Sequence, residues 1–125
     1  MTEQPGTHLE SIGEVLGIGV EDVDIAPEEP IVWESRANWF QSRIRAVGGR
    51  VYLTERHLIF VPSELETRYA GQGLIAPLAD LERAFVKGPM KMIRVVSQAG
   101  TEEKFVIPRR QESAERIDRA IQAAR

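Results

Sequence analysis

The sequence predicts a mainly β protein of the α+β class: a seven-stranded, strongly bent antiparallel sheet or partly open barrel, capped by one C-terminal helix. Two observations lead to this prediction. Short segments with a strand-like pattern follow one another at close intervals between turn residues, which favours an antiparallel sheet over βαβ units. The C-terminal segment, 111–125, then changes to the period of an amphipathic helix.

Length and cysteine content narrow the class of protein further. The chain has 125 residues, which is the size of one domain. It contains no cysteine, so a disulfide framework, a thiolate zinc site and a cysteine nucleophile are all excluded. Because the sequence shows no signal peptide and no long apolar run, we expect a cytoplasmic protein, with a peripheral position at the membrane as the alternative.

Charge divides the chain into two parts. Residues 1–30 hold eight acidic side chains and no lysine or arginine, whereas residues 31–125 hold eleven acidic and sixteen basic residues and so carry a net charge of +5. We therefore assign 1–30 as an acidic N-terminal leader and 31–125 as the folded domain. A leader of this composition acts either as a solvated tail or as a segment that meets a basic surface.

The leader also contains a short apolar pattern. Four side chains fall on one side of a helix, which predicts either a short docked helix or a frayed segment: Leu9, Ile12, Val15 and Leu16. If this segment folds back over a basic face of the domain, its carboxylates compete there with an anionic ligand.

The first strand is expected at 31–40, where the period changes to two. Trp33, Ala37 and Trp39 share one side of an extended chain, so we expect them in the core. Further strands are predicted at 43–54, 57–62, 73–78, 82–87, 91–97 and 102–107. The helix over 111–125 is expected to bury a narrow stripe and to be capped by Ser113 or Gln111; the stripe consists of Ala114, Ile117, Ile121 and Ala124.

The segment GGRVYLTERHLIFVP, residues 48–62, predicts the tightest strand pair. Three polar residues separate its two strands, and so short a connection permits only antiparallel pairing. Val51 and Leu53 then share one face with Leu58 and Phe60. The two glycines that open the segment suit a bulge or a sharp bend, and the proline that closes it ends the second strand.

This hairpin resembles that of the GRAM domain, a variant of the pleckstrin homology (PH) fold. Residues 49–54, followed by 58–60, are similar to the family's glycine, aliphatic, tyrosine, leucine and threonine strand and its leucine-x-phenylalanine strand. Residues 76–81 resemble its later proline-leucine-x-aspartate segment. Gly100 with 105–107 resembles its glycine turn and final strand.

The resemblance covers residues 30–121 and contains one departure. The family usually carries arginine directly before the leucine of the third strand, whereas this chain has His57 there and Arg56 one position earlier. The resemblance implies two nearly orthogonal sheet layers closed at one end by the helix. It also implies a membrane-associated or protein-docking function without catalysis.

The sequence offers little for an enzyme. The two histidines are His8 in the leader and His57 in the hairpin, and no HExxH, Walker or GxSxG motif occurs. The glycines at 71 and 73 form a GxG without a following helix, which does not support a dinucleotide site. We therefore predict no catalytic residue, no metal, no cofactor and no small-molecule substrate.

Anion binding is the better supported chemistry. Arg43, Arg45 and Arg50 cluster near the first strand connection, where the PH fold often receives phosphoinositide headgroups, and Arg56 completes the candidate set. Guanidinium groups suit phosphate because they donate two parallel hydrogen bonds. Phe40 is the candidate for an exposed apolar membrane tip. The alternative is an ordinary solvated strand face.

Two binding functions therefore remain open. One is protein interaction or self-association through a sheet edge or apolar patch. The other is peripheral binding of anionic lipid, including phosphoinositide headgroups, through the arginines. Three basic residues contribute roughly 3 kcal/mol at an anionic leaflet, too little to hold a lone domain there, so we favour protein interaction. Nucleic acid is not expected, because acids are interleaved with the basic residues.

Overall fold

The computed structural model describes residues 29–63 and 73–125, so the predicted leader helix lies outside the described residues. Within them the chain forms seven strands, one short 3-10 turn and one α-helix. In chain order these are β1 (Ile31–Phe40), β2 (Ala46–Thr54), β3 (His57–Pro62), β4 (Leu74–Pro77), η2 (Leu78–Asp80), β5 (Leu81–Lys87), β6 (Met92–Ser97), β7 (Glu102–Val106) and α3 (Arg110–Ala123).

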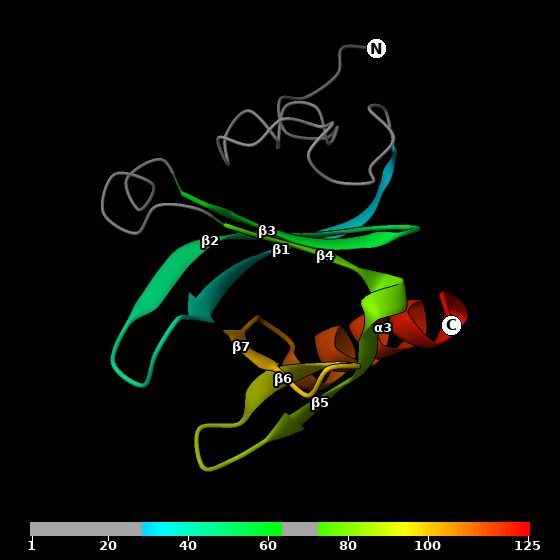
Figure 1. The fold of residues 1–125 in the computed structure, drawn as a ribbon. Coiled ribbons are helices and arrows are strands. Elements are labelled where there is room, and N and C mark those ends of the chain that lie inside the picture. The colour runs from blue at the N-terminus through cyan, green and yellow to red at the C-terminus, as the bar shows by residue number, and fades with distance from the viewer. Residues whose placement is uncertain (1–28, 64–72) are drawn as a thin grey trace.

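The strands form one antiparallel sheet in the order β4-β3-β2-β1-β7-β6-β5. Its two edges, β4 and β5, do not pair with each other, so the sheet is bent but not closed. In Figure 1 β3 and β4 lie in the upper layer, β5 to β7 lie in the lower layer, and α3 covers one end. This confirms the predicted class: seven antiparallel strands, bent and open, with a single C-terminal helix.

Most strand limits agree with the sequence prediction, and the second strand is the exception. It was expected to begin at residue 43, but residues 43–45 lie in the turn that precedes β2. The N–H of Gln41 donates to the carbonyl of Arg45 at 2.9 Å and closes this turn. The glycines at 48 and 49 pair with β1 without a shift of register, so they carry no bulge.

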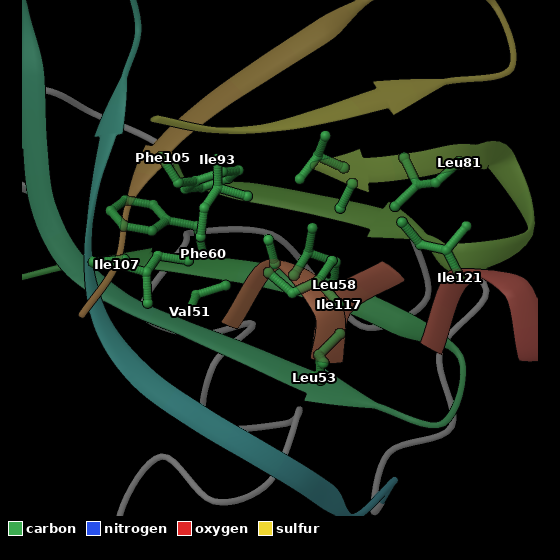
Figure 2. Close-up of a cluster of buried hydrophobic side chains, with 14 of the residues drawn as sticks. Val51, Leu53, Leu58, Phe60, Leu81, Ile93, Phe105, Ile107, Ile117 and Ile121 are labelled. Atoms are coloured by element: carbon green, nitrogen blue, oxygen red, sulfur yellow. The ribbon is translucent and has the colours of Figure 1, made fainter. Parts of the chain in front are cut away.

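The core lies between the two layers and α3 (Figure 2). The predicted hairpin faces are confirmed, because Val51 lies opposite Phe60 and Leu53 opposite Leu58, and all four are buried. The Phe60 ring lies 6.1 Å from that of Phe105 in the other layer. These contacts join strands that are far apart in sequence, as expected for a core formed by two layers of one bent sheet.

The helix α3 buries its predicted stripe and also protects an edge of the sheet. Ile117 and Ile121 are fully buried, and both point into the core in Figure 2. On the flank of the helix, Asp118 Oδ1 accepts the N–H of Ala84 at 2.9 Å, and Gln122 Nε2 donates to the carbonyl of Glu82, also in β5, at 2.9 Å. These side chains saturate backbone groups that an edge strand leaves unpaired.

The start of α3 differs from the prediction. The position before the helix is Arg109, in the left-handed region with φ 55°, and no side chain caps it. Ser113 lies inside the first turn, where its hydroxyl donates to the carbonyl of Pro108 at 2.8 Å. The hydroxyl therefore anchors the preceding chain and does not serve as the predicted cap.

Gly49 is required by the close approach of β2 to β3. A Cβ at this position would lie 2.1 Å from the carbonyl oxygen of Val61 and 2.9 Å from the Phe60 ring. We expect Gly49→Ala to lower the free energy of unfolding by about 3 kcal/mol, because the crowded atoms are backbone and core. Urea denaturation measures this loss.

Gly100→Ala is the matched control. Gly100 has a positive φ of 91° but open space around its Cβ position. Only the backbone strain of about 1 kcal/mol should appear there. Equal losses in the two variants would contradict the crowding argument.

Candidate functional site

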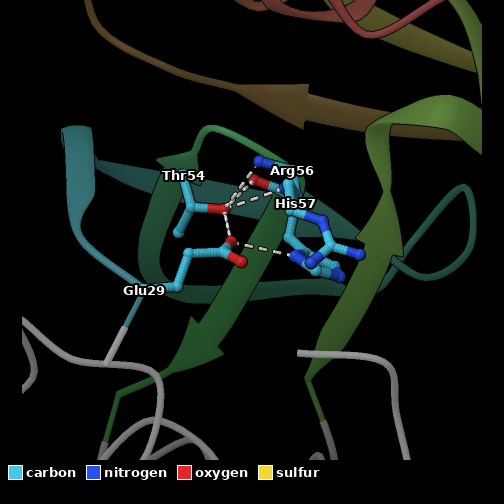
Figure 3. A network of polar contacts seen from close by, with 4 residues as sticks. All are labelled: Glu29, Thr54, Arg56 and His57. Atoms are coloured by element: carbon cyan, nitrogen blue, oxygen red, sulfur yellow. Dashed lines mark hydrogen bonds and ion pairs between the residues drawn. The ribbon is translucent and has the colours of Figure 1, made fainter. Parts of the chain in front are cut away.

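A buried polar network joins the start of the described chain to the β2–β3 hairpin (Figure 3). Glu29 Oε1 accepts a hydrogen bond from His57 Nδ1 at 3.0 Å and another from the Thr54 hydroxyl. The Thr54 oxygen in turn accepts the backbone N–H of His57 at 2.8 Å and that of Arg56 at 3.2 Å. Glu29, Thr54 and His57 are all more than nine-tenths buried.

This network explains the departure from the GRAM pattern at position 57. His57, at the start of the predicted strand 57–62, is the first residue of β3 and is only 2% exposed. Its imidazole binds Glu29, and so the position fastens the incoming chain to the sheet. A buried imidazole held in this way is a structural contact and offers no face to a ligand.

The candidate site is a groove on the side of the sheet that faces away from the core. It has a volume of about 1700 Å³ and is lined by β1, β2, the end of β3 and the segment that joins β7 to α3. Five of the described lining residues are basic and none is acidic. The basic residues are Arg36, Arg50, Lys91, Arg109 and Arg110.

The centre of the groove places two like charges opposite each other. Arg36 of β1 and Arg50 of β2 are direct cross-strand partners, an arrangement that destabilises a sheet when nothing compensates for it. Arg50 Nη2 lies 3.0 Å from Glu34 Oε1, but both side chains are exposed, and such pairs contribute at most about 1 kcal/mol. Glu34 therefore offsets part of the Arg50 charge, and the other basic residues of the groove supply the remaining positive potential.

The far wall of the groove adds positive potential from the helix. Arg109 and Arg110 stand at the N-terminus of α3, where the helix dipole already carries a partial positive charge. Arg109 lies 3.7 Å from Glu112, and both side chains are more than 70% exposed. Basic residues at this end do not compensate the dipole, so an anionic ligand would stabilise this wall.

Tyr52 forms part of the groove beside Arg50. Burial raises the pKa of its phenol above the ordinary value; the nearby Glu34 carboxylate raises it further, and attraction and hydrogen bonding from Arg50 oppose the rise. The phenol is therefore neutral at physiological pH. It offers a hydroxyl donor to an anion without adding negative charge.

The structure separates the predicted arginines. Arg50 lies in the groove, whereas Arg43 and Arg45 lie in the β1–β2 turn. Arg45 precedes Arg50 by five residues, roughly 17 Å of strand. Arg56 lies in the β2–β3 turn at the opposite end of β2.

The apolar tip of the β1–β2 turn is not where the sequence suggested. Phe40 ends β1 and is partly buried. Ile44, between the two turn arginines, is 97% exposed. The structure therefore offers Ile44 as the exposed apolar side chain of this turn.

Sequence reasoning missed four of the five groove cations. Arg36 carried a usable signal, because it falls on the outward side of the first strand and the hairpin register sets it opposite Arg50. Arg109 and Arg110 also carried a sequence signal, because two adjacent basic residues at the start of a helix are unfavourable unless an anion lies nearby. Lys91 lies in the turn before β6 and carried none. Its place depends on how that turn meets the sheet.

Within residues 29–63 and 73–125 no group of three or more histidine, cysteine or acidic residues is placed to hold a metal ion. In the same part of the chain, no helix has the length and apolar character needed to cross a bilayer.

Comparison with known proteins identifies the fold. No protein-family model and no curated protein matches the chain. Several solved structures are similar to it. The C-terminal domain of an unknown protein from Leishmania infantum has a TM-score of 0.64 and 11% identity, over 75% of this chain and 85% of that chain.

Other similar structures contain PH domains. The linker-DH/PH domains of p115-RhoGEF have a TM-score of 0.64 and 15% identity, over 78% of this chain and 30% of that chain. The DH/PH fragment of PDZRHOGEF in complex with human RhoA has a TM-score of 0.62 and 14% identity, over 77% and 30%. This chain thus spans about a third of those proteins. Identities this low show the fold alone, and the fold is PH-like.

The buried network should contribute strongly to stability. We expect Thr54→Val to lower the free energy of unfolding by at least about 2 kcal/mol, because it removes one of the two hydrogen bonds to the buried Glu29 carboxylate and the acceptor of two backbone N–H groups. Chemical denaturation of the two proteins measures the difference.

Thr101→Val is the control. It makes the same substitution at an exposed threonine, whose hydroxyl is hydrogen-bonded to that of Ser97. That control should change stability by no more than about 0.5 kcal/mol. A Thr54 variant as stable as the Thr101 variant would show that the network is not what fastens the chain.

Proposed function

We propose that this chain is a non-catalytic, GRAM-type PH-like binding module whose outer groove binds an acidic segment of a partner protein. The observation that carries the proposal is the composition of the groove: five basic residues and no described acid among those that line it. The hairpin that resembles the GRAM motif supplies β2 and β3, and Arg50 within it faces the groove.

The shape and size of the groove favour an extended acidic ligand over a small anion. A volume of about 1700 Å³ exceeds the roughly 300–1,000 Å³ of sites that enclose small molecules. Its basic residues come from β1, β2, the turn before β6 and the start of α3, so one small anion cannot pair with all of them. A peptide that carries several carboxylates can contact several of these groups at once.

The similar structures support protein binding in a general way. The DH/PH fragment of PDZRHOGEF was solved in complex with RhoA, so a protein with this fold occurs in a protein complex. Nothing about RhoA itself transfers to this chain. The fold and the groove together favour a binding role, and the sequence contains no catalytic motif.

Charge reversal in the groove tests the proposal. We expect Arg36→Glu to weaken binding of a fluorescein-labelled oligoglutamate peptide by about tenfold, because the change removes one attraction and adds a repulsion of similar size, each up to about 1 kcal/mol. Fluorescence anisotropy at low ionic strength measures the affinity. Binding should also weaken as salt rises, since these charges are exposed.

Arg119→Glu is the matched control, because this exposed arginine of α3 is not among the groove residues. It makes the same change of net charge and should leave affinity within about twofold. If both variants weaken binding equally, net charge and not the groove is responsible. If the unmodified chain does not bind the peptide, the proposed function fails.

Peripheral membrane binding is the second candidate, favoured by the β1–β2 turn. Ile44 is 97% exposed and stands between Arg43 and Arg45. Inserting one isoleucine contributes about 2 kcal/mol, and two arginines add about 1 kcal/mol each. The sum of about 4 kcal/mol is less than a single myristoyl chain provides, so this turn alone binds a membrane weakly.

Co-sedimentation with phosphatidylcholine–phosphatidylserine vesicles tests this candidate. We expect Ile44→Asp to reduce the bound fraction by about tenfold at low salt, because it removes the inserted side chain and adds a repelled charge. Val32→Asp is the control, since Val32 of β1 is 56% exposed but lies outside this turn. Equal sedimentation of the unmodified chain and Ile44→Asp would eliminate the membrane candidate.

A further inference from the structure

The hairpin β2–β3 is buried on both of its faces. Val51, Leu53, Leu58 and Phe60 point into the core, and the alternate side chains point away from it. Two of these outward side chains are nevertheless buried: Tyr52 is 8% exposed and Ile59 is fully covered, and neither belongs to the core cluster. An apolar side chain on an outward face is buried only where something lies over it.

The described elements leave this outer face without a cover. Ile59 pairs with Tyr52 on one side and Ile75 on the other, but cross-strand partners lie beside a residue and not above it. Within the described ranges, α3 makes most of its sheet contacts with β5 and β6, in the other layer. The cover must therefore be sought in another part of the chain.

The incoming chain enters on this same face. Glu29 binds Thr54 and His57, which share the outward parity of Tyr52 and Ile59. Residues 1–28 are thus tethered at the edge of the uncovered surface. Twenty-eight residues can reach this surface, because Arg50 lies only four residues, roughly 13 Å, along β2 from Thr54.

The composition of the tethered segment matches the surface beside it. Residues 1–28 contain seven acids, no lysine or arginine, and an apolar stripe. The outer face offers Tyr52 and Ile59, and then the basic groove, which Tyr52 also lines. The segment thus contains both apolar side chains and carboxylates, and the surface offers an apolar patch and guanidinium groups as their partners.

We propose that the acidic leader is an intramolecular ligand: residues 1–28 lie across the outer face of β2–β3, with their apolar stripe against Tyr52 and Ile59 and their carboxylates in the basic groove. The stripe consists of Leu9, Ile12, Val15 and Leu16. An acidic partner must then displace the leader, which lowers its apparent affinity. This competition rests on the proposed function, whereas the docking of the leader does not.

Spin labelling of the full chain tests the docking. Because the chain has no cysteine, Ser11→Cys provides one attachment site for a nitroxide. We expect broadening of the amide signals of Arg50, Tyr52 and Ile59 in the labelled protein. A nitroxide on Ala99→Cys, in the exposed β6–β7 turn, should spare these signals. If the Ser11 label leaves them unbroadened, the proposal is overturned.

Neutralising the leader tests the competition. The variant replaces five carboxylates by their amides: Glu10→Gln, Glu14→Gln, Glu21→Gln, Asp22→Asn and Asp24→Asn. We expect the full chain with these changes to bind the oligoglutamate peptide about fivefold to tenfold more tightly, because the neutralised leader no longer competes with the peptide for the groove. A change of this size is usual when two ligands affect each other's binding modestly. Unchanged affinity would overturn the competition.

The two experiments separate the failure of this inference from that of the proposed function. Unchanged affinity in the neutralised leader, with binding still sensitive to Arg36→Glu, overturns the competition and leaves the groove function standing. No peptide binding by either protein, with broadening still present, overturns the groove function and supports the docked leader.

Discussion

The strand β1 is the element on which the rest of the structure depends, because it belongs to both layers of the sheet. Along most of its length it pairs with β2 alone, and only residues 38–40 also pair with β7. The two layers can enclose one core because β1 passes from one to the other. Ala37 and Gly49 are paired just before this point, so two small residues lie opposite each other there.

The same constraint forms the groove. Because β1 is shared, the outward positions of β1 and β2 come close to the end of β7 and the start of α3, which follows directly after it. Arg36 and Arg50 thereby share a surface with Arg109 and Arg110, although more than fifty residues separate the two pairs in sequence. The inward side of these strands is apolar and forms the core, and the outward side concentrates charge.

The core and the basic groove therefore lie on opposite faces of the same strands. Three outward residues of β2 differ in kind. Thr54 donates a hydrogen bond to Glu29, Tyr52 is a buried aromatic side chain, and Arg50 is a basic residue of the groove. If the leader and an acidic segment of a partner both bind this outer surface, they compete for the same residues, and the core does not have to change. In such a competition, the charges mainly affect the association rate of each segment, and the apolar contact at Tyr52 mainly affects its dissociation rate.

The sequence by itself determined the strand segments along the chain, the two-faced hairpin and the apolar stripe of the helix, because periodicity is a local consequence of burying one face. It also named Arg50, as one of a predicted cluster with Arg43 and Arg45. Only the tertiary structure decided that Arg43 and Arg45 lie apart from Arg50, and that His57 is buried against Glu29. Alternation shows which side of a strand a residue faces. It does not show which distant segments share that side, because that depends on where β1 changes its partner.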